Sequence, residues 1–181
     1  KISYLFPRAH AVAYVMMAFR IAWFKVYHPL AFYAAYFSIR AKAFDLRIMT
    51  GDLKTQMTEF NRIKALDRGA SPKDKDLMSA LEVSMEMYQR GYRFVNVDIQ
   101  HSEARRFSIK DGALLPPFLA IDSLGETVAD AIVAEREERP FTSLKDLQRR
   151  CKVSNTIIDL MKELKCCGEL PEDEQMSLFG A

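Results

Sequence analysis

Residues 121–136 read IDSLGETVADAIVAER, and this stretch decides the fold that we predict for the second half of the chain. A glycine directly before a helical sequence, followed by apolar residues at four-residue spacing, is typical of a helix-hairpin-helix. In that motif the exposed amides at the start of the helix hold a DNA phosphate without reading bases. The residues that we expect to contact a DNA backbone are Ser123, Leu124, Gly125, Glu126 and Thr127.

Two features of this stretch leave a purely structural αα-hairpin open as the alternative. Ser123 stands where the first glycine of the usual turn would be, although a serine hydroxyl can itself bond phosphate. The helix that follows is acidic, and its acids are Glu126, Asp130, Glu135, Glu137 and Glu138. The residues alone therefore do not separate a DNA clip from a helical connection.

The rest of the chain is predicted to be mainly α, with one small β insert. Prolines at first helical positions, N-capping side chains and terminal glycines indicate seven helices. The first three are placed at residues 8–28, 29–40 and 44–68, and the third has a possible break at residues 50–52. The fourth lies between Ser71 and Gly91, and the last three lie near residues 125–138, 143–151 and 154–165.

The predicted β insert lies between these helical parts. Val95, Val97 and Ile99 alternate with polar residues, which is the period of a strand. An Asp-Gly turn at residues 111–112 joins residues 107–109 to residues 113–115 as a hairpin.

The first predicted helix combines apolar side chains with positive charge. Arg8 and His10 lie in its first turn, where free amides favour an anion, and Tyr14 and Lys25 follow His10 on one stripe. A second stripe is expected to face the core, and it consists of Val12, Val15, Phe19, Ala22 and Val26. Phosphate binding and a plain core helix are both compatible with this pattern.

Composition points to a globular protein with an uneven charge distribution. The chain has 181 residues and a formal net charge of +2, yet residues 1–50 carry +6 and residues 51–181 carry −4. Twelve of the twenty aromatic residues lie in the first 44. Disorder throughout, a collagen-like fibre and a disulfide scaffold are excluded by such a composition. We expect contacts with anions or bases near the start of the chain.

Several kinds of site and segment are not expected in this chain. The longest apolar run, residues 9–24, is interrupted by His10 and Arg20 and is too short to span a bilayer. The cysteines, Cys151, Cys166 and Cys167, have neither zinc nor disulfide spacing and are expected to be reduced cytosolic thiols. Without paired carboxylates, a phosphate loop or a metal cluster, the chain is expected to catalyse nothing by itself. Lys1 is not an initiator, so we expect a fragment of a longer protein.

The acidic tail ends in a short peptide with apolar anchors, after Pro171. Such a peptide suits a groove on a partner protein, because a solvated tail has no core of its own in which to bury the apolar anchors. The alternative is that the C-terminus folds back onto the domain. The peptide consists of Gln175, Met176, Ser177, Leu178 and Phe179.

Five ordered stretches together resemble the C-terminal end of a Gram-positive, PolC-type bacterial DNA polymerase III alpha subunit. They are residues 4–14 (YLFPRAHAVAY) with 24–29 (FKVYHP), 90–93 (RGYR), 115–118 (LPPF), 124–126 (LGE) and 175–179 (QMSLF). The last is similar to the pentapeptide by which bacterial polymerases bind the sliding clamp. Met176 stands where leucine is common, and because the two side chains have similar volumes we expect weakened rather than lost binding.

The resemblance implies a DNA-directed DNA polymerase, a cytoplasmic nucleotidyltransferase of DNA replication. Its palm carboxylates, which hold two metal ions, expected to be Mg²⁺, would lie upstream of this chain, so no catalytic residue, metal ligand or cofactor is assigned here. Arg8, His10, Tyr14 and Lys25 would lie near the incoming deoxynucleoside triphosphate or the template. The implied partners are primer-template DNA, the nucleotide, the sliding clamp and the remaining polymerase domains, with no membrane.

The resemblance also implies a domain organisation. Residues 1–91 would form a helical fingers segment, residues 92–117 a small β element, residues 118–165 a helix-hairpin-helix-like duplex-binding region, and residues 166–181 an acidic tail with the clamp peptide. The alternative is a non-catalytic helical scaffold, in which the aromatic N-terminal helices form a protein interface and the hairpin is structural.

Overall fold

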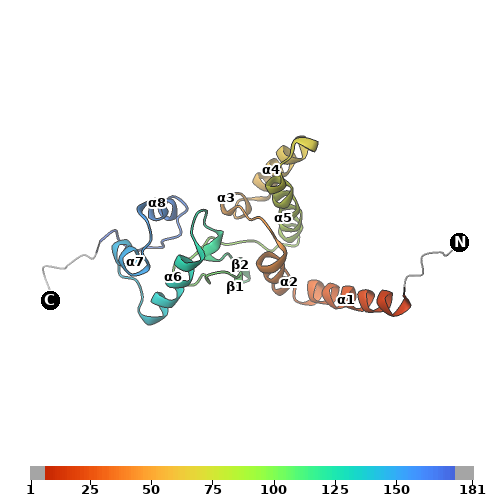
Figure 1. The fold of residues 1–181 in the computed structure, drawn as a ribbon, viewed down its shortest axis with the longest axis horizontal. Coiled ribbons are helices and arrows are strands. Elements are labelled where there is room, and N and C mark those ends of the chain that lie inside the picture. Colours follow the sequence, from red (N-terminus) through yellow and green to blue (C-terminus); the bar gives the residue numbers. More distant parts are fainter. Residues whose placement is uncertain (1–6, 174–181) are drawn as a thin grey trace.

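The computed structural model describes residues 7–173, and Figure 1 shows an elongated molecule with α1 at one end and α7 and α8 at the other. The fold is mainly α with one two-stranded β-hairpin, as the sequence predicts. The clamp peptide predicted at residues 175–179 lies outside the described residues.

The N-terminal helices are α1 (Arg8–Tyr27), α2 (Pro29–Ala35), α3 (Leu46–Met49), α4 (Leu53–Ala65) and α5 (Pro72–Gln89), and a π-helical turn, Tyr36–Arg40, extends α2. Their starts follow local chemistry. Ser71 and Asp74 form a reciprocal capping box at α5, and the Asp52 side chain accepts from the Thr55 amide at α4. The predicted break at residues 50–52 separates α3 from α4.

The first of two apolar cores lies between α2, α4, α5 and the β-hairpin, and we call it the aromatic core. Its rings meet edge to face, with centroids 4.9 Å apart for Phe37 and Phe94 and 5.0 Å apart for Phe44 and Phe107. Its buried members are Tyr33, Phe37, Met49, Ile63, Leu77, Ala80, Leu81, Met87, Phe94, Phe107 and Leu114.

The β-hairpin consists of β1 (Ser108–Lys110) and β2 (Ala113–Leu115), paired antiparallel with Ile109 opposite Leu114. Asp111 and Gly112 both have positive φ, +50° and +74°, as a two-residue hairpin turn requires. The strand predicted from the alternation at residues 95–99 is wrong: the described residues there make one isolated bridge, between Phe94 and Leu114. Pairing with β2 ends at Val95, whose amide donates to the Leu114 carbonyl at 2.9 Å. Val97 and Ile99 lie in the irregular segment that follows and are buried there without a partner strand.

The second core, which we call the hairpin core, lies among α6 (Glu126–Glu138), α7 (Leu144–Cys151) and α8 (Asn155–Glu163), with a 3-10 turn at Phe118–Ala120. All three helices occur where the sequence predicts them. Its buried members are Leu46, Val97, Ile99, Phe118, Ile121, Leu124, Ala129, Ile132, Phe141, Leu144, Leu147, Cys151, Val153, Ile157, Ile158, Met161, Cys166 and Cys167.

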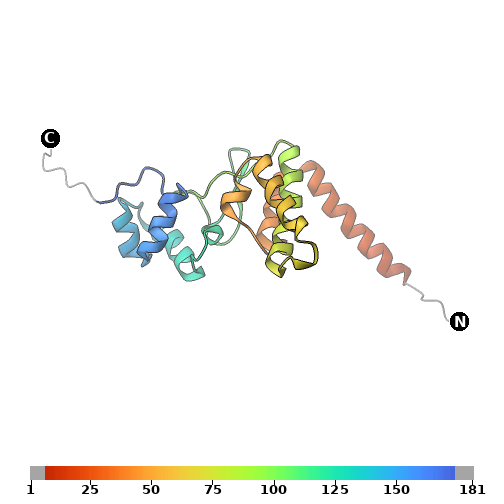
Figure 2. The same cartoon turned by 90° about the horizontal axis from the view of Figure 1, so that it is seen from above.

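Helix α1 corrects one prediction. None of its residues is buried, and the stripe expected to face the core is exposed, with Val12 at 57% and Phe19 at 73% of full exposure. Figure 2 shows the reason: α1 extends away from both cores and contacts the rest of the chain at its α2 end. An apolar stripe indicates a contact surface, but it does not show whether the contacting residues belong to the same 181 residues.

Candidate nucleic-acid interface

The turn before α6 has the backbone shape that the sequence predicts for a hairpin clip. Ser123 adopts a left-handed conformation with φ +64°, the region that usually favours glycine. Leu124 is buried in the hairpin core, while Ser123 and residues 125–127 are exposed. The buried leucine thus holds the turn and leaves its backbone open to solvent.

The start of α6 presents amide donors without an intramolecular acceptor. Gly125 is the N-cap residue with φ −75° and ψ 157° and, having no side chain, provides no side-chain cap. Among residues 7–173, the amides of Gly125, Glu126 and Thr127 donate no hydrogen bond, whereas the Leu124 amide donates to the Ile121 carbonyl at 3.2 Å. We call these three donors the amide cradle. Free amides at a helix N-terminus favour an anion.

Arg105 offsets part of the negative charge at the start of α6. Its guanidinium forms ion pairs with both Glu126 and Asp130, and its Nε lies 3.0 Å from Asp130 Oδ1. The hydrogen bond from Arg105 lowers the pKa of Asp130. The sequence shows these acids but not their pairing with Arg105, because no local pattern links residues more than twenty positions apart.

A cleft of about 200 Å³ between the two cores runs beside this arginine. Lys42 and Arg105 are the charged residues in its lining, and Lys42 is exposed and makes no ion pair within the part of the chain that the structure describes. Lys42 shares this cleft with Arg105, and it also lines a neighbouring pocket with the carboxylates Asp45, Asp76 and Asp122. No sequence motif marks Lys42.

The four residues predicted to contact nucleotide or template do not form one cluster. Arg8, His10 and Tyr14 share the exposed first turns of α1, and the His10 and Tyr14 rings lie edge to face at 4.4 Å. Lys25 lies near the other end of α1, about 25 Å from Arg8 along the helix axis at the usual rise per residue.

Lys25 has an interaction that the sequence did not reveal. Its Nζ lies 2.9 Å from Glu86 Oε2 on α5, and the Tyr33 hydroxyl donates to the same oxygen at 2.8 Å. Burial alone would raise the pKa of Glu86, but the hydrogen bonds from Lys25 and Tyr33 outweigh it and lower the pKa. Arg90 adds a hydrogen bond to the Lys25 carbonyl at 3.2 Å. Lys25 thus anchors the C-terminal end of α1 to α5.

A second hairpin joins α7 to α8 and repeats the geometry of the first. Lys152 has φ +54°, Val153 is buried, and Ser154 caps α8 by accepting from the Ile157 amide. The sequence predicts both helices but not the hairpin between them, because the left-handed position, Lys152, is not a glycine.

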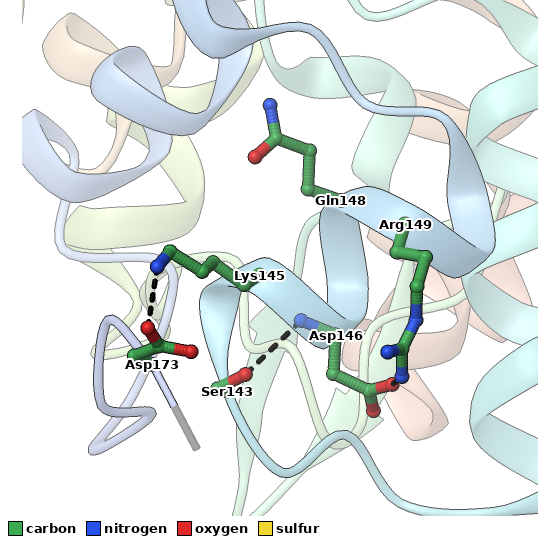
Figure 3. Close-up of a pocket in the computed structure, with 6 residues that line it drawn as sticks. All are labelled: Ser143, Lys145, Asp146, Gln148, Arg149 and Asp173. Carbon is green, nitrogen blue, oxygen red and sulfur yellow. Dashed lines mark hydrogen bonds and ion pairs between the residues drawn. The ribbon is translucent and has the colours of Figure 1, made fainter. Parts of the chain in front are cut away.

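A buried carboxylate, Asp146, ties this second hairpin to α6. It accepts from Arg149 at 2.8 Å, Arg139 at 3.2 Å and Arg150 at 3.3 Å, and from the Thr142 amide at 3.3 Å. Its own amide donates to Ser143 Oγ at 3.0 Å (Figure 3). Burial opposes ionisation, yet the Thr142 amide and the arginines lower the pKa of Asp146.

The described residues contain no arrangement suited to metal or thiol chemistry. No three His, Cys, Asp or Glu side chains group as a metal site within residues 7–173. All three cysteines are free and buried, and burial raises the pKa of Cys151 to about 11 and that of Cys166 to about 12. These thiols therefore stay protonated near neutral pH.

Helix α1 is the one helix among the described residues that is long and apolar enough to cross a membrane by length and composition. The helix is thus longer than the apolar run at residues 9–24 that was expected to be too short, but a single helix of this kind is weak evidence for a membrane span.

Residues 91–175 match a family described as a helix-hairpin-helix motif, and α6, α7 and α8 lie within this range. Along 99% of its length the chain is similar to DNA polymerase III PolC-type. Identity is 48% over 179 residues with the protein of Caldanaerobacter subterraneus subsp. tengcongensis and 49% over 182 residues with that of Streptococcus suis. The chain spans 12–13% of the length of these relatives. The resemblance inferred from sequence to a segment of this polymerase is thereby confirmed.

Proposed function

We propose that this chain is the duplex-binding C-terminal segment of a replicative, cytoplasmic DNA polymerase. The observation that carries the proposal is the amide cradle, exposed at the start of α6 in a chain whose relatives are named DNA polymerase III PolC-type. Backbone amides bind phosphate without regard to base, as a polymerase that copies every sequence requires. Pairing of Glu126 and Asp130 with Arg105 supports the cradle, because it offsets the charge that would repel a phosphate.

Arg8, His10 and Tyr14 are proposed to contact the incoming nucleotide or the template strand. Their exposure on the first turns of α1 supports this role, because a guanidinium and a helix N-terminus both favour phosphate and a tyrosine ring can stack on a base. Lys25 is proposed to act differently from the sequence prediction. Through its ion pair with Glu86 it positions α1, and thereby the three residues at the far end.

The chemistry of nucleotidyl transfer is assigned to the remaining polymerase domains. The carboxylates of residues 7–173 do not gather as a metal site, so they do not fit the two Mg²⁺ ions that such an enzyme uses. The chain alone is therefore proposed to be inactive. The exposed apolar stripes of α1 fit packing against those other domains, since patches of this kind mark contact surfaces.

The peptide at residues 175–179 is proposed to tether the polymerase to the sliding clamp. Tethering raises the effective concentration of polymerase beside its primer end after each release. Replacing both Leu178 and Phe179 with Ala should abolish binding to purified clamp, measured by surface plasmon resonance. Replacing Ser177 with Ala provides the control with intact apolar anchors. Undiminished binding of the double variant would refute the tether.

Duplex binding is tested by its dependence on salt. Each phosphate held contributes about −0.9 to the slope of log K against log salt concentration, so two or more contacts predict a slope of about −2 or steeper. Fluorescence anisotropy with labelled duplexes of unrelated sequence measures the slope and the expected lack of sequence preference. A flat response would instead support the structural hairpin of a non-catalytic scaffold.

A further inference from the structure

Three residues of the acidic tail, Pro171, Glu172 and Asp173, are held against α7, and we call them the acidic strap. Its backbone accepts two hydrogen bonds from the first turn of α7: the Leu144 amide donates to the Pro171 carbonyl at 2.9 Å, and the Lys145 amide donates to the Glu172 carbonyl at 3.2 Å. Both amides belong to the group that a helix leaves without an internal partner. The strap therefore occupies the anion-favouring end of α7.

Side chains of the strap form ion pairs with lysines on both helices of the second hairpin. Glu172 Oε1 lies 2.7 Å from Lys162 Nζ on α8, and Asp173 pairs with Lys145 on α7. Figure 3 shows the Asp173 carboxylate directed at the Lys145 ammonium. Glu172 and Asp173 are exposed, at 81% and 61% of full side-chain exposure. Exposed pairs of this kind are weak and are exchanged easily for other anions.

The surface beneath the strap continues into an open cavity of about 480 Å³ on the outer side of α7. Its lining consists of Ser143, Lys145, Asp146, Gln148, Arg149 and Asp173, and Arg149 pairs with Asp146 within it (Figure 3). The strap thus supplies two carbonyls and two carboxylates to a face that offers amides, lysines and an arginine. A nucleic-acid backbone offers the same face a row of anionic oxygens.

We propose that the acidic strap is an internal competitor of nucleic-acid phosphates, so that duplex DNA binding to the second hairpin displaces it from Lys145, Lys162 and the first turn of α7. DNA is favoured over an acidic protein because α7 and α8 belong to the region that matches a helix-hairpin-helix motif, and because Lys145 and Lys162 present positive charge where the strap lies. The inference rests on the proposed duplex-binding function, and it adds a second contact surface with its own occupant.

Neutralising the strap should strengthen duplex binding. The double variant Glu172→Gln with Asp173→Asn keeps both backbone hydrogen bonds and the side-chain volumes and removes the two competing charges. We expect affinity for labelled duplex, measured by anisotropy at low salt, to rise about three- to tenfold, because two exposed ion pairs no longer have to be broken.

The matched control is Glu137→Gln with Glu138→Gln at the end of α6. These exposed acids form no ion pair within residues 7–173, and their neutralisation changes net charge equally. The control should raise affinity less than twofold. An equal rise in both variants would assign the effect to overall charge and overturn the proposal, as would a strap variant that binds no better than the unmodified chain.

A second measurement follows the strap directly. The backbone amide NMR resonances of Glu172 and Asp173 should move towards the values of an unstructured peptide when duplex displaces the strap, and resonances that stay unchanged in the DNA complex would overturn the proposal. If neither the unmodified protein nor any variant binds duplex, the proposed function fails as well. If the unmodified protein and both variants bind duplex equally, only the strap inference fails. A strap variant that gains binding to polyglutamate and not to duplex would assign the surface to an acidic protein.

Discussion

Replacing Glu126 with Pro tests the amide cradle by deleting one donor while keeping the helix. Glu126 is the first residue of α6, the position where proline is most readily accommodated, and Pro29 and Pro72 already occupy it in α2 and α5. The preceding residue, Gly125, has ψ 157°, which is the extended conformation required before proline. The Glu126 amide donates no hydrogen bond within residues 7–173, so none is lost.

The substitution also removes a carboxylate, and Glu126→Ala is therefore the matched control. That control keeps the N–H while it breaks the ion pair with Arg105, and it should bind duplex as well as the unmodified chain or better, since a negative charge is lost. A hydrogen bond to a charged group contributes about 1.5–3 kcal/mol, and exposure to solvent favours the lower end. Glu126→Pro should accordingly bind duplex about tenfold more weakly than Glu126→Ala.

Fluorescence anisotropy with a labelled duplex at fixed salt provides the comparison, and urea unfolding followed by circular dichroism checks that both variants fold. We expect the two free energies of unfolding to agree within about 1 kcal/mol, because proline at this position costs the helix little. Equal affinity of the two folded variants, within a factor of two, would show that the Glu126 amide holds no phosphate and would refute the reasoning.

The other predictions concern a buried carboxylate and an exposed cation. Asp146→Asn should lower the free energy of unfolding by about 1–3 kcal/mol in urea, mainly through Arg150, because Arg139 and Arg149 are largely exposed and their pairs are weak. Because the folded protein lowers the pKa of Asp146, this difference should be constant near neutral pH and shrink below about pH 4 as the carboxylate is protonated; a constant difference at all pH values would contradict it. Arg8→Ala in an intact polymerase should raise the KM for nucleotide or lower kcat, and unchanged steady-state kinetics would restrict Arg8 to a packing role.

Features set by neighbouring residues were predictable from the sequence. The capping box between Ser71 and Asp74 and the hairpin turn at Asp111 and Gly112 depend on atoms a few residues apart. The turn at residues 123–125 was recognised in the same way, even though serine replaces glycine at its left-handed position. The alternation at residues 95–99 wrongly predicted a strand. A half-buried strand requires burial with period two, but such burial does not ensure that another strand pairs with the segment.

The ion pairs near the candidate site could not be predicted from the sequence. Arg105 and Glu126, Lys25 and Glu86, and Lys162 and Glu172 are ten to about sixty positions apart. Whether an acid repels a phosphate or is already paired depends on which cation the fold places beside it. No periodicity or spacing in the chain contains that information.

The sequence by itself determined the helices, the hairpin, the first clip turn and the resemblance to a polymerase segment, because local backbone preferences and family motifs are written in consecutive residues. Only the tertiary structure decided that α1 is uncovered, that Arg105 pairs with two acids at the start of α6, and that the acidic strap contacts the first turn of α7. Exposure and ion pairing depend on contacts between distant segments, and these exist only once the two cores have brought those segments together.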